Sequence, residues 1–274
     1  MTSVKIPQNV LVLATHGSAC VPAEAQKHLH DSFSPRLQRN FSDFATKALL
    51  KNFPKRQIAC PKYGRIVGDP NRSIHDSDLF RAVDFNNIQI WKKPLSRKQK
   101  KKYLIASRQS YLDSIFAKIE YLCQITSPKE PLILLDLHDT GNRMLGETHA
   151  VDVSRAEFTM PKVIFSNQNH KTTESAFLRK AMKVFQTVFE VDDTEAKLNE
   201  VFYGGFITKF FGGVESNQML DTLLQKYNRK RDSLLVFQCE LNRDLYLDEA
   251  QQKIRPEMGR IRRKFEQFVS QLAR

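Results

Sequence analysis

Long apolar runs, paired cysteines and flexible linkers are all missing from this chain. No stretch of its 274 residues approaches the roughly 20 apolar residues of a membrane helix, and the N-terminus has no signal-peptide cleavage pattern. Cys20, Cys60, Cys123 and Cys239 stand singly, without a CxxC pair or the density of a disulfide scaffold. We therefore expect a soluble cytoplasmic protein. Because neither an internal repeat nor a Pro/Gly/Ser-rich segment divides it, we expect one domain over residues 1–274.

Basic residues are in clear excess, with 43 Lys and Arg against 30 Asp and Glu, a net charge of +13. Such an excess is typical of proteins that bind nucleic acid or anionic membranes, and also of enzymes with anionic substrates. Much of it lies in KKPLSRKQKKKY (residues 92–103), which few aromatics interrupt, so a stacking platform for nucleic acid is poorly supported. We interpret this stretch as a solvated loop and the start of a helix.

Strand-like and helix-like segments alternate along the chain. Short apolar runs predict buried strands at NVLVLAT, PLILLDLH, KVIFSN and SLLVFQCELNRDLY. Apolar residues at helical spacing predict helices over SDFATKALLKNF, from about Lys98 to Cys123, over ESAFLRKAMKVFQTVF and over the C-terminal PEMGRIRRKFEQFVSQLAR. This alternation predicts an α/β fold of three layers, with helices on both faces of a mixed, largely parallel sheet.

Three of the predicted strands end on residue types that carry chemistry. The first leads into His16, the second ends on Asp136 and His138, and the third contains Glu240. In open α/β sheets, ligands bind beyond the carboxyl ends of the strands. Two histidines with a nearby carboxylate are the ligands of a catalytic zinc that keeps one position open for water, and a further carboxylate would serve as general base.

An anion-binding site is indicated at Asn71 and Arg72, which follow the turn Asp69-Pro70. Arginine can hold a carboxylate through two parallel hydrogen bonds. The alternative is that Arg72 pairs with Asp76 or Asp78 at the surface. Arg243 and Arg143 are further candidates for a substrate carboxylate, or for bracing Asp136 or Glu240.

Several segments together resemble the N-formylglutamate amidohydrolase family, which is related in fold to zinc carboxypeptidases and aspartoacylases. They are, in the order of the family, ATHGSACVP, SDF, GDPNR, LLDLHD, YGGFITKFFG and FQCELNRDLYLDE. The resemblance spans almost the whole chain, and its last segment is the most specific. It implies a metal-dependent hydrolase that cleaves the amide of an N-formyl or N-acyl amino acid, a small anionic substrate.

Matching residue by residue, the resemblance implies roles for individual side chains. His16, Asp43 and His138 would hold one Zn²⁺, and Glu240 would be the general base. The resemblance also supports Asn71 and Arg72 as the residues that bind the substrate carboxylate. Independently of the resemblance, we expect Gly204 and Gly205 to let a loop pass close to the site, because glycine permits close backbone approach. The alternative is a tight turn between a strand and a helix.

This chain also departs from the family pattern. It has Thr-His-Gly-Ser at the first histidine instead of Pro-His-Ser-Gly, Asp139 instead of Ser after the second, and Lys47 where an acidic residue is usual. Asp139 would either orient a neighbouring side chain or disfavour an acidic substrate. Glu24 is the alternative to Asp43 as the carboxylate ligand.

Two other functions stay open from the sequence. One is a hydrolase of the same scaffold that acts on peptide or cell-wall amides. The other is a non-catalytic basic protein that binds nucleic acid or anionic lipid, which would bind with a steep salt dependence and without zinc.

Overall fold

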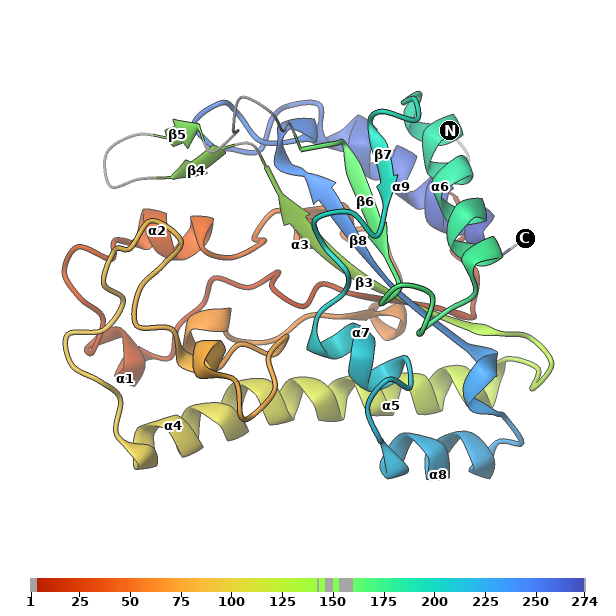
Figure 1. The fold of residues 1–274 in the computed structure, drawn as a ribbon, viewed down its shortest axis with the longest axis horizontal. Helices are drawn as coiled ribbons and strands as arrows, with labels where there is room; N and C mark the ends of the chain where they lie inside the picture. Colours follow the sequence, from red (N-terminus) through yellow and green to blue (C-terminus); the bar gives the residue numbers. More distant parts are fainter. Residues whose placement is uncertain (1–3, 142, 146–149, 153–159, 274) are drawn as a thin grey trace.

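The structure is a computed structural model, and it describes residues 4–141, 143–145, 150–152 and 160–273. Figure 1 shows a central sheet with helices on both faces, as the alternation of segments predicts. The strands are β1 (Val10–Leu13), β2 (Ile58–Ala59), β3 (Leu132–Thr140), β4 (Arg143–Leu145), β5 (Ala150–Asp152), β6 (Val163–Ser166), β7 (Ala196–Leu198) and β8 (Leu234–Asn242). The α-helices are α1 (Ala23–Gln26), α2 (Pro35–Asn40), α3 (Thr46–Leu49), α4 (Arg97–Leu104), α5 (Ser110–Ile125), α6 (Ser175–Phe189), α7 (Phe206–Phe211), α8 (Gln218–Lys226) and α9 (Met258–Leu272).

The main sheet has the strand order β2-β1-β3-β8-β6-β7, and β4 pairs with β5 separately. β2, β1, β3 and β8 are mutually parallel, while β6 and β7 run the opposite way because β6 pairs antiparallel with β8. The prediction of a mixed, largely parallel sheet is confirmed.

Each face of the sheet has its own hydrophobic core. One face packs against α3, α6 and α9, with Leu135, Phe237 and Phe268 buried there. The other packs against α5, α7 and α8 through residues such as Leu134, Ile115 and Ile207. Successive residues of a strand point to opposite faces, and the strands are apolar on both because both are covered.

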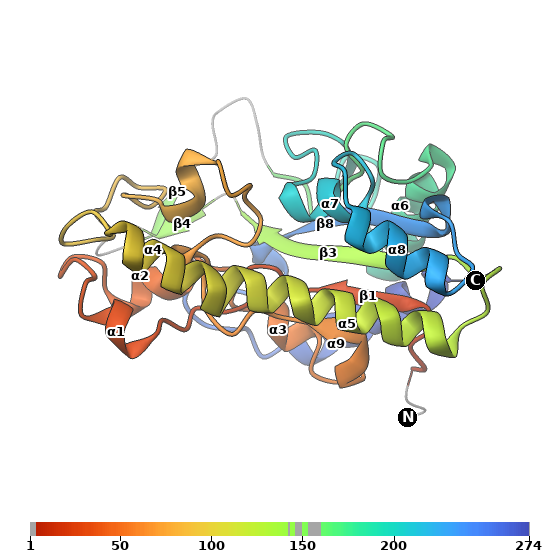
Figure 2. The ribbon, with the colours of Figure 1, turned by 90° about the horizontal axis from the view of Figure 1, so that it is seen from below.

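A third cluster lies beyond the carboxyl ends of the parallel strands. It is built by residues 25–103 around Phe33, Ile66 and Trp91, and it closes against Tyr103 at the start of the long helix. In Figure 2, α4 and α5 run as one rod that joins this part of the chain to the sheet. The functional end of the sheet is therefore covered by the N-terminal third of the chain.

The long helix extends to Ile125, slightly beyond the predicted range, and Ser96 and Gln99 form a capping box at its start. The interpretation of residues 92–103 as a loop and helix start is confirmed. The predicted helix at SDFATKALLKNF is wrong in extent, because only Thr46–Leu49 is helical. Asp43 lies in the turn before it, and its backbone N–H donates to the carbonyl of His16 at 3.0 Å. Within the described residues, no helix is both long and apolar enough to cross a membrane.

Candidate active site

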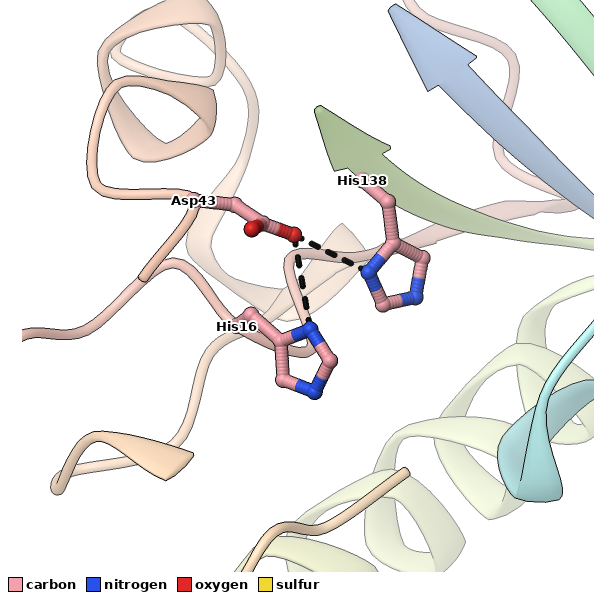
Figure 3. A group of neighbouring side chains, drawn as sticks. All are labelled: His16, Asp43 and His138. Carbon is pink, nitrogen blue, oxygen red and sulfur yellow. Dashed lines mark hydrogen bonds and ion pairs between the residues drawn. The ribbon is translucent and has the colours of Figure 1, made fainter. Parts of the chain in front are cut away.

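Three side chains from distant parts of the sequence meet at the carboxyl ends of β1 and β3. The Nδ1 atoms of His16 and His138 lie 3.5 Å and 3.0 Å from Asp43 Oδ2. Figure 3 shows both rings turning this nitrogen toward the same carboxylate oxygen. All three residues are buried, and one ligand atom of each lies within 4.8 Å of the others. A tetrahedral zinc ion with bonds of about 2.1 Å needs ligand atoms about 3.4 Å apart, so the residues fit such an ion.

Each histidine of this triad is fixed by a second carboxylate at its far nitrogen. His16 Nε2 lies 2.7 Å from Asp69 Oδ1, and His138 Nε2 lies 3.1 Å from Asp136 Oδ1. A carboxylate at the far nitrogen selects the tautomer and the ring orientation, as is usual for metal-binding histidines. With the far nitrogens bound in this way, the Nδ1 atoms of both histidines face Asp43 Oδ2.

These orienting carboxylates are themselves held. Asp69 Oδ2 accepts hydrogen bonds from Arg65 Nε at 2.9 Å and Nη2 at 2.6 Å. Asp136 accepts a short hydrogen bond from Thr15 and a second, at 3.4 Å, from Thr208. The role of Asp69 and Arg65 is not evident from the sequence, although the GDPNR segment that contains Asp69 marks the region.

Glu240 lies beside His138 on the neighbouring strand. The two residues are paired in the register of β3 and β8 and therefore point to the same face of the sheet. Glu240 Oε1 accepts a hydrogen bond from Gln238 Nε2 at 2.8 Å, and Gln238 Oε1 accepts one from the backbone of Gly205 at 3.0 Å. Gln238 is a positioning residue that the sequence reasoning missed, although the two-residue period of the strand points to it.

The charges of the site perturb its ionisable groups strongly. Burial disfavours the carboxylate of Asp43, but hydrogen bonds and charges from His138 and His16 outweigh it and hold its pKa well below the ordinary value. Burial also opposes protonation of His138, but Asp136 and Asp43 raise its pKa well above the ordinary value. Burial and the charges of Asp43, Asp139 and Asp136 raise the pKa of Glu240 to about 8, against the effect of His138.

A family profile for N-formylglutamate amidohydrolase matches residues 8–247. The chain belongs to this family. Membership makes it a hydrolase of the amidohydrolase type, acting on C–N bonds. A search of curated proteins gave no significant match.

Two solved structures share the fold. An N-formylglutamate amidohydrolase from Ralstonia eutropha JMP134 superposes with a TM-score of 0.67 at 14% identity, covering 97% of this chain and 92% of that one. A gene product of Agrobacterium tumefaciens gives a TM-score of 0.61 at 16% identity, covering 97% and 91%. At these identities the likeness supports the architecture alone.

The other polar residues that the sequence predicted for the site differ in their distance from the triad. Asn71 is close, with Nδ2 3.4 Å from His138 Nε2, and its Oδ1 accepts from the backbone of Ile207 at 3.0 Å. Arg72 lies at the surface, where Nη1 is 3.8 Å from Asp76 Oδ2, as the alternative interpretation expects. Glu24 pairs with Lys102 on the surface, so Asp43 and not Glu24 lies with the two histidines. The side chain of Arg143 lies outside the described residues.

Arg243 is buried behind the triad. It donates from Nε to Asp139 Oδ1 at 2.5 Å, and its Nη2 lies 3.5 Å from Asp43 Oδ1. Asp139 also accepts from the hydroxyl of Tyr246 at 3.0 Å. Asp139 thus holds Arg243, and Arg243 contacts Asp43.

Proposed function

We propose that this protein is a zinc-dependent amidohydrolase that cleaves the amide of an N-formyl or N-acyl amino acid, a small anionic substrate. The observation that carries the proposal is the convergence of His16, Asp43 and His138, with a buried carboxylate behind each histidine and Glu240 alongside. These three residues would hold Zn²⁺. When bound, the ion would lower the pKa of water to about 7 and polarise the substrate carbonyl.

Glu240 is the proposed general base. It accepts the proton of the attacking water and then delivers it to the leaving amine, so that one side chain serves both steps. In the metal-free protein, burial and the neighbouring carboxylates raise its pKa, which favours uptake of a proton by this side chain. Gln238 fixes Oε1 through its amide, which limits the positions that the carboxylate can take.

The proposed substrate side of the site comprises Asn71, Arg72 and Arg243. The Asn71 amide is next to His138 and can donate to a substrate oxygen. Arg72 supplies positive charge at the rim once it leaves its weak contact with Asp76. Arg243 acts through Asp43, whose position it fixes.

The first test is the metal content of the purified protein, measured by mass spectrometry after purification without chelators or a metal-binding tag. We expect about one zinc per chain in the wild type and its loss in His138→Ala. His75→Ala, which alters an exposed histidine outside the triad, is the matched control and keeps the metal. Equal and negligible metal in the wild type and His138→Ala would refute the metal site.

Activity on an N-acyl amino acid panel tests the chemistry. Glu240→Gln keeps the shape of the side chain but removes its ability to accept a proton. We expect it to lower kcat by about 100-fold or more with zinc still bound. Full activity of this variant with metal bound would show that Glu240 is not the base.

A further inference from the structure

The long helix contains a π-helical turn, Ile105–Gln109, between α4 and α5. Such turns are rare and frequently occur at functional sites. In this turn the apolar residue is exposed and the charged residue is buried: Ile105 is 58% exposed, whereas Arg108 is only 7% exposed. The opposite is usual for these residue types. A buried arginine therefore lies within this irregular turn.

Arg108 is held from two sides. Its Nε donates to the backbone carbonyl of Arg72 at 3.2 Å, and its guanidinium carbon lies 4.4 Å from the centre of the Phe206 ring. A guanidinium fixed on its Nε edge and stacked on an aromatic face has a defined plane and direction. Little entropy is then lost when its two Nη groups bind a ligand.

The terminal nitrogens of Arg108 have no partner within the part of the chain that the structure describes. No described carboxylate forms an ion pair with Arg108, and Glu215 and Asp69 act on it only through space. Asp69 is already bound by Arg65 and His16. The Arg108 side chain is mostly removed from solvent and has no ion-pair partner among the described residues, so a ligand anion that reaches its terminal nitrogens would compensate its charge.

Both supports of Arg108 lead directly to the active site. Arg72 follows Asn71, whose amide lies next to His138. Phe206 follows Gly205, which binds Gln238 and through it Glu240. Arg108 is therefore positioned by the same two segments that contact the metal triad and the proposed base.

We propose that Arg108 binds a carboxylate of the substrate through its two Nη groups and so sets the requirement for an acidic substrate. This inference rests on the proposed function for the identity of the reaction. It also gives Arg72 a second role. The backbone carbonyl of Arg72 orients Arg108, and this contact does not depend on the position of the Arg72 side chain. Lysine would replace Arg108 only in part, because it carries the charge but lacks the planar fork that binds both carboxylate oxygens.

The test compares N-formylglutamate with its diamide, which has the same amide to be cleaved but no carboxylate. We expect Arg108→Gln to lower kcat/KM for the acid by about 100-fold, mainly through KM, and for the diamide by less than about threefold. Arg108→Lys should recover only part of the loss. Arg56→Gln is the matched control, because Arg56 also stacks on an aromatic ring of the long helix, 4.8 Å from the centre of Tyr121, and lies outside the site. Equal losses on the two substrates, or no loss, would overturn the proposal.

Binding separates this inference from the reaction itself. In zinc-loaded Glu240→Gln, calorimetry with N-formylglutamate should show the Kd rise by about 100-fold when Arg108→Gln is added, with the metal content unchanged. If the wild type hydrolysed nothing but this rise was observed, the hydrolase proposal would fail and the role of Arg108 would stand. An unchanged Kd, or no binding to Glu240→Gln, would count against Arg108.

Discussion

At the scale of single residues, the site is built at the expense of stability. Glu240 is buried beside Asp43, Asp136 and Asp139, so that in the metal-free protein its carboxylate is disfavoured by desolvation and by like charges. Selection for a stable fold would replace such a residue by an uncharged one. A buried carboxylate with a strongly raised pKa is typical of active-site residues that transfer protons, which is the role proposed for Glu240.

This cost predicts a pH-dependent difference between the metal-free wild type and Glu240→Gln. The pKa of Glu240 rises from 4.5 to about 8 on folding, so between these values the folded state holds a proton that the unfolded state has lost. Stability contributed by that proton is present at low pH and is lost as the pH rises through this window. We expect the metal-free variant to be more stable than the wild type at pH 8, by about 4 kcal/mol, and similar to it near pH 5. Urea unfolding at the two pH values measures this, and a difference independent of pH would contradict it.

At the scale of elements, the start of α7 connects the outer loops to the site. The Gly204-Gly205 turn precedes this helix, and the backbone of Gly205 passes against the Asn71 side chain. The sequence predicted a loop that passes close to the site here, but not this contact. A Cβ at Gly205 would lie 2.2 Å from Asn71 Nδ2. Asn71 in turn accepts hydrogen bonds from Ile207 and Phe206, so its position and that of the helix depend on each other.

Gly205→Ala should therefore impair the site more than the fold. The added methyl group must push Asn71 away from α7 and His138, and we expect kcat/KM to fall by about tenfold or more while the protein remains folded. Gly259→Ala in α9 is the matched control, since a Cβ there meets nothing within 4 Å. Removing a glycine from a helix should leave activity unchanged and stabilise the protein by about 0.5–1 kcal/mol. Steady-state kinetics and thermal melts of both variants provide the test, and unchanged kinetics in Gly205→Ala would show that Asn71 can move without consequence.

At the scale of the whole molecule, the triad joins parts of the chain that are far apart in sequence. His16 follows β1, Asp43 belongs to the segment before α3, and His138 lies near the end of β3. An ion bound by all three cross-links the sheet to the N-terminal segment, and a ligand that binds only the folded state stabilises it by mass action.

Chelation should consequently lower the melting temperature. At a free zinc concentration about 1,000 times Kd, the ion contributes about 4 kcal/mol, which for a chain of this size corresponds to a fall in Tm of roughly 10 °C on its removal. The fall should be reversed by added zinc and absent in His138→Ala. Differential scanning calorimetry with and without chelator measures it, and an equal fall in the variant would place the stabilising metal elsewhere.

The sequence by itself determined the architecture and indicated the end of the sheet where the candidate site lies. Apolar runs predicted the strands β1, β3, β6 and β8, and helical spacing predicted the long helix, α6 and α9. The polar residues at the strand ends indicated the carboxyl end of the sheet. These features are local, so they can be read from neighbouring residues. The zinc itself, the relation to zinc carboxypeptidases and the roles of the site residues stay predictions.

Tertiary structure alone decided which residues support one another. The shortness of α3, the carboxylates behind the two histidines and the contact of Arg243 with Asp43 all depend on side chains that are distant in sequence. Arg108 is the clearest case. From the sequence it is one more cation near the lysines of this helix, and only the packing of Arg72 and Phe206 against it at the π-helical turn shows how it is held. Hydrophobic periodicity specifies the face of an element, whereas charge pairing and close packing are specified by what the rest of the chain places opposite that face.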